Sequence, residues 1–171
     1  MRQRLAVAIA VAIPASAIAQ DQPANQTAES AWQILEEGGE GSGAIAQAPD
    51  GSQIVLKCDK PGSREVYALI MSGEKKLATP KSQPMARPIR FLFDGKASQQ
   101  SWRFYETYVA AFGKTSDRSL ARFVIDLRRA STLRVMMDTG LGPDVDLSFN
   151  VAGASEAISY VYEACRDSAP R

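Results

Sequence analysis

Few side chains in this chain could carry out chemistry, because the sequence contains no histidine. A Ser-His-Asp triad, a Cys-His pair and a histidine-ligated zinc site are therefore excluded. A Ser-Lys dyad or a pair of carboxylates remains chemically conceivable, but no such residues stand at a diagnostic spacing. We predict no catalytic residues, no enzymatic activity and no cofactor.

Two cysteines, Cys58 and Cys165, are the remaining reactive groups. Cys58 shares one face of an alternating segment with Ile54 and Leu56, and Cys165 lies on the apolar stripe of a C-terminal helical segment. In an oxidising compartment, two inward-facing cysteines most simply form a disulfide. The alternative is redox activity, which usually needs a C-x-x-C pair near a helix start. We predict a structural disulfide between Cys58 and Cys165 that attaches the last helix to the sheet.

Four arginines are candidate binding residues. They are Arg118, Arg122 and Arg129 on the outer face of a predicted helix, and Arg134 on the strand that follows. Such a group could receive an acidic partner or an anionic polymer of the envelope. Asp126 lies within four residues of Arg122 and Arg129, so local ion pairing on a solvated helix face is the alternative interpretation.

Three aspartates, Asp138, Asp144 and Asp146, occur in the segment DTGLGPDVD. If Asp138 paired with Asp146 across a hairpin, two like charges would face each other, and a calcium ion could neutralise them. The spacing matches no established calcium loop. We therefore favour a solvated hairpin tip and predict no metal site.

The N-terminal segment predicts export from the cytoplasm. Two arginines in MRQR precede an apolar run, Leu5–Ile13, and the small residues around Ala19 suit a signal peptidase. The apolar run is too short for a membrane anchor, since a spanning helix needs about 20 apolar residues. We predict a signal peptide over residues 1–19, cleaved between Ala19 and Gln20, and a periplasmic location.

The predicted mature chain has a balanced charge. Loss of Arg2 and Arg4 lowers the count of Lys and Arg from 20 to 18, against 19 Asp and Glu, which leaves a formal charge of −1. This balance argues against nonspecific nucleic-acid binding. Residues 20–30 are polar and predict a disordered lead-in, and residues 31–168 suit one globular domain. We expect no membrane span in the mature form, and the oligomeric state stays open.

Alternating apolar residues separated by turn residues predict a fold that is mainly β (α+β). Strands are expected at Trp32–Glu36, Ala44–Gln47, Gln53–Cys58, Glu65–Met71, Ile89–Phe93, Ser101–Glu106, Thr132–Asp138 and Val145–Val151. Helical spacing is expected over residues 116–130 and Ala154–Cys165. We predict an antiparallel, sandwich-like sheet with two packed helices, the C-terminal one held by the disulfide.

Three aromatic residues leave one segment ambiguous. Ser101–Glu106 fits a strand with Trp102 and Phe104 facing inward, but the spacing of Trp102, Tyr105, Tyr108 and Val109 also fits a helix. The open question concerns Trp102, Tyr105 and Tyr108. They could line a ligand pocket or fill the core, and we favour the core.

The chain resembles periplasmic type VI secretion-associated proteins of the TagO/VasI type. The similarity lies in the run F-x-x-x-G-x-x-x-A from Phe149 to Ala157, which leads to a helical cysteine, in Leu56-Lys57-Cys58, in the helix Ser119–Arg129 and in Leu133-Arg134-Val135. It covers about two-thirds of the mature chain. In that family an arginine commonly precedes x-Asp in a middle strand, where this chain has Leu92. The chain also resembles invasion-associated locus B proteins, which are similarly small, secreted and disulfide-bearing.

These features predict a noncatalytic accessory or binding protein of the bacterial envelope that acts through contacts with a protein partner. The TagO/VasI resemblance likewise implies an envelope accessory protein without known chemistry. The alternative is a protein that binds a small molecule or an envelope polymer, with weak hydrolysis by carboxylates as a variant. That alternative calls for a concave apolar pocket with converging polar groups.

Overall fold

The computed structural model describes residues 31–37, 41–79, 83–113 and 118–170. The predicted signal peptide (1–19), its cleavage site at Ala19 and Gln20, and the predicted lead-in (20–30) lie outside these residues. The first residues of the expected helix 116–130 also lie outside them.

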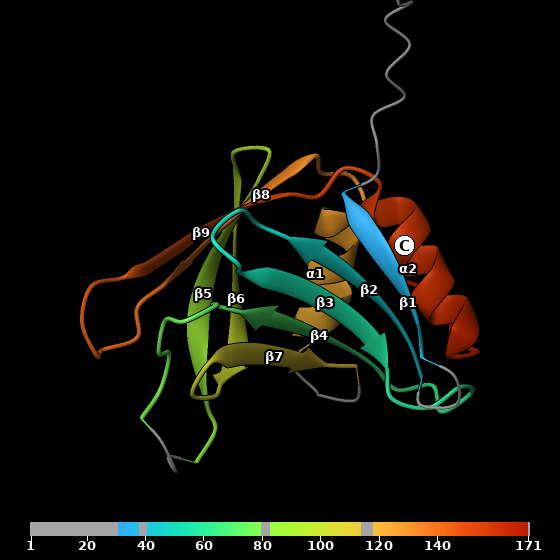
Figure 1. Ribbon diagram of the computed structural model, residues 1–171, viewed down its shortest axis with the longest axis horizontal. Coiled ribbons are helices and arrows are strands. Elements are labelled where there is room, and N and C mark those ends of the chain that lie inside the picture. Colours follow the sequence, from blue (N-terminus) through green and yellow to red (C-terminus); the bar gives the residue numbers. More distant parts are fainter. Residues whose placement is uncertain (1–30, 38–40, 80–82, 114–117, 171) are drawn as a thin grey trace, which may run out of the picture.

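The described residues form one antiparallel sheet of nine strands and two helices (Figure 1), which confirms the predicted fold class. The strands are β1 (Trp32–Glu37), β2 (Gly41–Gln47), β3 (Gln53–Cys58), β4 (Val66–Met71), β5 (Met85–Phe93), β6 (Lys96–Phe104), β7 (Tyr108–Phe112), β8 (Thr132–Met137) and β9 (Val145–Asn150). The helices are α1 (Ser119–Leu127) and α2 (Ala154–Ala164). The strand order across the sheet is β1-β2-β3-β4-β7-β6-β5-β8-β9.

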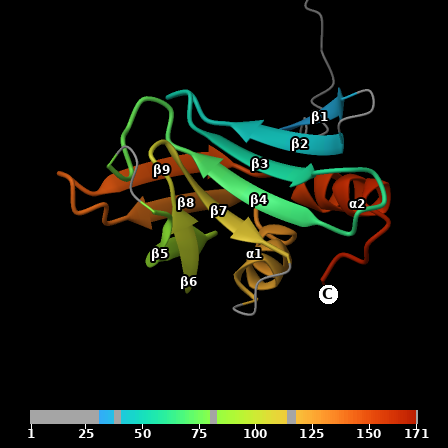
Figure 2. The ribbon, with the colours of Figure 1, turned by 90° about the horizontal axis from the view of Figure 1, so that it is seen from below.

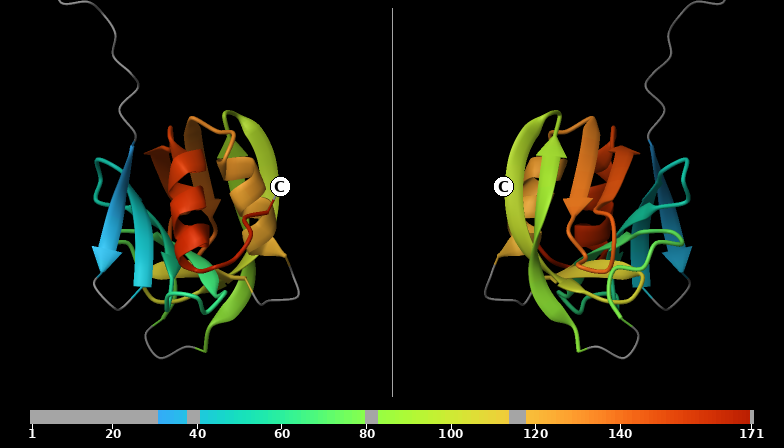
Figure 3. Two further views of the ribbon diagram at one scale, coloured as in Figure 1. Left: turned by 90° about the vertical axis from the view of Figure 1, so that its right-hand side faces the viewer. Right: turned by 90° about the vertical axis from the view of Figure 1, so that its left-hand side faces the viewer.

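The sheet is continuous and curls around both helices, so that its two halves face each other like the layers of a sandwich (Figures 2 and 3). Its far ends approach each other beside β1, where Ala31 N donates to Ala152 O at 3.2 Å. Trp32 Nε1 also donates to Val151 O at 3.1 Å. The sheet therefore encloses one core, which is filled from the inside by the apolar faces of α1 and α2.

The middle of the chain differs most from the expected elements. β5 begins at Met85 and not at the expected Ile89, so Pro88 lies inside the strand, opposite Ser101. Of the expected strand Ser101–Glu106, residues Ser101–Phe104 belong to β6, so this part is a strand rather than a helix, and Tyr105 and Glu106 lie in the connection to β7. β7 was not expected as a separate strand; Tyr105 N donates to Tyr108 O at 2.8 Å and so reverses the chain between β6 and β7.

An aromatic cluster attaches α1 to the inner face of the sheet. The ring of Phe123 lies 4.9 Å from that of Trp102 in an edge-on arrangement, and 5.4 Å from that of Phe91, measured between centroids. Phe123 has no exposed surface and Trp102 is 1% exposed. Edge-on and tilted contacts of this kind add to the stabilisation from apolar burial. They fix the position of α1 along the β5–β6 hairpin.

The predicted disulfide between Cys58 and Cys165 is present, and it joins the end of β3 to the end of α2. Both cysteines are completely buried. The β3–β4 turn also binds this helix end, because Arg64 N donates to Cys165 O at 3.1 Å and Gly62 N to Ala164 O at 3.2 Å. The last helix is thus held to the sheet by covalent and hydrogen bonds together.

Removal of this disulfide should lower stability considerably. The cysteines are 107 residues apart, and closing a loop of that length restricts the unfolded chain by up to ~4–5 kcal/mol in the chain-entropy model. We expect the double variant C58A/C165A to have a free energy of unfolding that is lower by an amount up to that value, measured by urea denaturation. A reducing agent should lower the midpoint of the wild-type protein and leave that of the variant unchanged. Equal midpoints for both oxidised proteins would contradict the prediction.

Candidate functional site

Helix α1 lies beside β6, and the two elements form the walls of a groove. Ser119 Oγ at the start of the helix donates to Ser101 O at 2.9 Å. Phe123, Val124 and Leu127 face the core, so the helix exposes the opposite side, which carries its arginines. The amphipathic pattern that packs α1 therefore also presents its cations to solvent.

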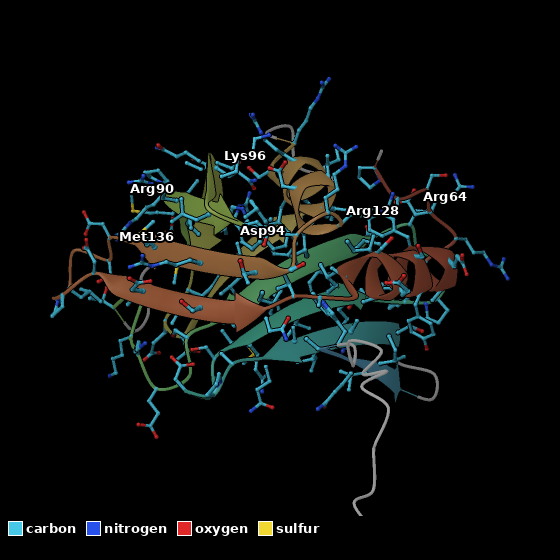
Figure 4. The ribbon with its side chains drawn as sticks, turned by 90° about the horizontal axis from the view of Figure 1, so that it is seen from above. Arg64, Arg90, Asp94, Lys96, Arg128 and Met136 are labelled. Atoms are coloured by element: carbon cyan, nitrogen blue, oxygen red, sulfur yellow. A yellow bond between two sulfur atoms is a disulfide. The ribbon has the colours of Figure 1, made fainter. Side chains whose placement is uncertain are left out.

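The groove consists of two cavities of about 350 and 620 Å³, and Arg122 lines both of them. We call their combined lining the α1–β6 groove. Its residues are Phe93, Asp94, Lys96, Ala97, Ser98, Gln99, Gln100, Ser101, Arg118, Ser119, Ala121, Arg122, Ile125, Asp126, Arg129 and Ala130. Figure 4 shows Lys96 at the end of the β5–β6 hairpin, on the side toward α1.

The α1–β6 groove has an excess of positive charge. Lys96 and three arginines face two carboxylates, Asp94 and Asp126, which gives a formal charge of +2. All four cations are exposed, and none of them forms an ion pair in the part of the chain that the structure describes. The expected alternative, in which Asp126 pairs with Arg122 or Arg129, is therefore not observed. Cations without a partner remain available for an anionic ligand.

Asp94 has a structural role at the edge of the groove. It begins the two-residue turn Asp94-Gly95 between β5 and β6, with both residues at positive φ as an Asp-Gly hairpin favours. Its carboxylate accepts hydrogen bonds from Thr132 N at 2.8 Å, from Ser131 N and from Thr132 Oγ1. These bonds, led by the one from the Thr132 backbone, hold the pKa of Asp94 below its ordinary value. Asp94 thus joins the β5–β6 turn to the loop between α1 and β8.

A chain of neutral polar groups lies on the inner face of β6. Trp102 Nε1 donates to Gln100 Oε1 at 3.2 Å, and Gln100 Nε2 donates to Ser98 Oγ at 3.4 Å. Gln100 is only 6% exposed. Because both of its polar atoms have partners, burial of this side chain carries little penalty.

Arg134 does not join the other three candidate arginines. It lies on β8 between the buried residues Leu133 and Val135, so it points to the outer face of the sheet. There Arg134 Nε donates to Asp146 Oδ1 at 2.8 Å, and a second nitrogen of its guanidinium contacts Asp146 Oδ2. This bidentate pair lowers the pKa of Asp146 and raises that of Arg134.

Asp138 and Asp146 do not face each other across the β8–β9 hairpin, so the condition for the calcium alternative is not met. Asp146 lies opposite Met136, not Asp138, and is already paired with an arginine. Asp138 Oδ1 accepts a hydrogen bond from Gly140 N at 2.9 Å and so stabilises the turn. Among the described residues, no group of three or more Cys, Asp or Glu side chains is placed to hold a metal ion. The observed contacts are those of a hairpin tip.

Trp102, Tyr105 and Tyr108, which could line a pocket or fill the core, lie in two different environments. Trp102 lies in the core, as expected. Tyr105 and Tyr108 are half-buried instead, and their rings stack at 4.4 Å between centroids and 11° between planes. Partial burial raises the pKa of Tyr108. Neither tyrosine lines the α1–β6 groove.

Comparisons with known proteins found no match for this chain among protein-family models, curated proteins or solved structures. Within the described ranges, neither helix is long and apolar enough to cross a membrane. The class of the protein is therefore stated from its fold and its candidate site. It has a disulfide-linked antiparallel sheet wrapped around two helices, with a cationic groove beside α1.

The hydrogen bonds of Asp94 predict a pH-dependent contribution to stability. Since its pKa is lowered in the folded state, the ionised carboxylate stabilises the fold above the unfolded-state pKa of about 4, and this contribution is lost as the pH falls through the lower folded value. We expect D94N to melt at a lower temperature than the wild type at pH 7, with a difference that narrows toward pH 3. D126N, which alters a groove carboxylate without such bonds, is the control. Identical melting temperatures of D94N and wild type at pH 7 would refute the role of Asp94.

Proposed function

We propose that this protein is a noncatalytic accessory protein of the bacterial envelope that binds a protein partner through the α1–β6 groove. The observation that carries the proposal is the group of four exposed cations, Lys96, Arg118, Arg122 and Arg129, which have no ion-pair partner among the described residues. Unpaired charges on an open groove favour rapid and selective association with a surface of opposite charge.

The proposed location is the periplasm. The predicted signal peptide motivates it, and the Cys58–Cys165 disulfide supports it, because such bonds persist in oxidising compartments. A disulfide that holds the C-terminal helix also suits a small exported protein, because the apolar core of a small domain contributes limited stability.

The proposed accessory role also draws on the resemblance to proteins of the TagO/VasI type. The position at which this chain departs from that family is Leu92, which lies opposite Arg134 on the outer side of β5. Leu92 does not line the α1–β6 groove. The difference from that family at Leu92 therefore lies outside the proposed contact surface.

A second candidate function is the binding of a small anionic molecule or an envelope polymer. The two cavities of about 350 and 620 Å³ fall within the range of ligand sites, and their cations would attract an anion. Hydrolysis by the groove carboxylates fits less well. A general acid needs a raised pKa, whereas the pKa of Asp94 is lowered by its hydrogen bonds.

Charge reversal in the groove should weaken the proposed complex. We expect R118E/R122E to reduce the yield of partner protein by roughly tenfold or more, because like charges opposed across an interface cost several kcal/mol. The measurement is in-cell crosslinking of the protein in its native envelope, followed by purification and quantitative mass spectrometry. Melting temperatures of all variants establish that they are folded.

The matched control is R64E/R90E, which changes the net charge equally. Arg64 and Arg118 share a left-handed backbone, with φ of 57° and 55°. Arg64 lies beside α2 and Arg90 on the outer side of β5, both away from the groove (Figure 4). This control should retain the partner. Capture of glycan alone, or of nothing beyond a tag-only sample, would reject the proposal and favour the second candidate.

A further inference from the structure

Strand β6 has a long unpaired edge. On one side all nine of its residues pair with β5. On the other side only Arg103 and Phe104 pair with β7, through Ala110 and Val109. The segment Lys96–Trp102 therefore has a strand partner on one side only. An edge of this kind can accept an additional strand.

The hydrogen-bonding phase shows which backbone groups face this edge. Tyr105 N donates to Tyr108 O, so the backbone N–H of Tyr105 points toward β7. The direction of the backbone N–H and C=O groups alternates from one residue to the next along a strand. The groups of Ala97, Gln99 and Ser101 therefore point to the same side of β6 as those of Tyr105, which is the unpaired side. In the described chain, no backbone group bonds to Ala97 or Gln99 from that side.

The open edge lies along the α1–β6 groove. Gln99 and Ser101 line the larger cavity, and the facing wall contains Arg118, Arg122 and Ile125 of the helix side. The hydrogen bond from Ser119 Oγ to Ser101 O occupies only one end of the edge. A chain that entered the groove would thus meet free amide and carbonyl groups on one side and cations on the other.

We propose that the α1–β6 groove binds an extended acidic segment of a partner protein, which adds to the free edge of β6 as a further antiparallel or parallel strand. The backbone of the segment bonds to Ala97 and Gln99, and its alternate acidic side chains contact Arg118 and Arg122. This inference rests on the proposed function, since it specifies how the partner is bound.

The spacing of the cations fits such a strand. Arg118 and Arg122 are four residues apart, or ~6 Å along a helix axis at 1.5 Å per residue. Successive side chains on one face of a strand are ~6.6 Å apart. Acidic residues at every second position can therefore meet successive arginines. The segment Lys96–Gln100, which ends before the bond to Ser101, offers about 16 Å of free edge, enough to pair with about five residues of a partner segment.

The test uses a defined probe, the acetylated and amidated peptide Glu-Val-Glu-Val-Glu-Val-Glu. Its binding to the full mature protein is measured by NMR titration, together with amide hydrogen exchange of Ala97 and Gln99. We expect binding, at least tenfold slower exchange at one or both amides, and no binding of the corresponding Lys-Val peptide.

Two N-methylated peptides separate strand addition from simple charge attraction. One carries the methyl groups on the valine amides and the other on the glutamate amides, so the side chains and charge stay the same. In an added strand only one of these sets faces β6. One methylated peptide should therefore lose at least tenfold in affinity while the other stays within about twofold of the parent.

Variants of Gln99 test the edge from the protein side. Q99P deletes an N–H that faces the groove and spares the pairing with β5, a position that proline tolerates in a strand. Q99A keeps the N–H and serves as its matched control. We expect Q99P to lose at least tenfold in peptide affinity and Q99A to remain within about twofold, with melting temperatures that show both variants folded.

The outcomes distinguish this inference from the proposed function. Absence of peptide binding, or binding that neither methylation pattern weakens and that leaves both amides unprotected, overturns strand addition. The proposed function then still stands if R118E/R122E loses the crosslinked protein and R64E/R90E retains it. Failure to capture any partner protein rejects the proposed function itself.

Discussion

The structure depends on one break in strand pairing, the short contact between β6 and β7. Only two residue pairs join these strands, although β6 pairs with β5 along its entire length. The sheet can therefore turn sharply at this point and bring its two halves around α1 and α2 (Figure 3). The same break leaves the rest of β6 without a second neighbour. The curvature that encloses the core and the open edge beside the groove thus have a common origin.

The two helices stabilise the curled sheet in different ways. α1 relies on local packing, in which Phe123 enters an aromatic cluster on the β5–β6 hairpin. α2 relies on a connection distant in sequence, because Cys165 bonds to the end of β3. Because apolar packing positions α1, its exposed polar side lies along β6, and the hydrogen bond from Ser119 Oγ to Ser101 O joins the helix to that strand. Arg118, Arg122 and Arg129 form no ion pair among the described residues, whereas Arg134 on the outer face of the sheet is paired with Asp146.

Local patterns in the sequence predicted much of this fold, because burial imposes a period on each element. The strand of Cys58, the amphipathic helix with Phe123 and the disulfide were all expected from such patterns. β7 was missed, since YVAAF is short and apolar on both faces and so shows no alternation. Whether Asp138 faces Asp146 could not be predicted, because alternation identifies the buried face of a strand but not the residue opposite. The helix arginines were expected as a site, but Lys96 and the β6 edge were not, since they depend on pairing between distant segments.

The disulfide also determines how the molecule carries a mechanical load. A pull on the two ends of the chain passes along the backbone to Cys58, crosses the sulfur bridge and leaves through Cys165. Every residue of the α1–β6 groove lies between these two cysteines in sequence, inside the covalent loop. Tension along the chain therefore bypasses the groove, and the segment from β4 to α2 stays unstretched while the strands before Cys58 bear the force. While the disulfide is intact, a pull on the ends of the chain cannot extend the backbone that carries the groove.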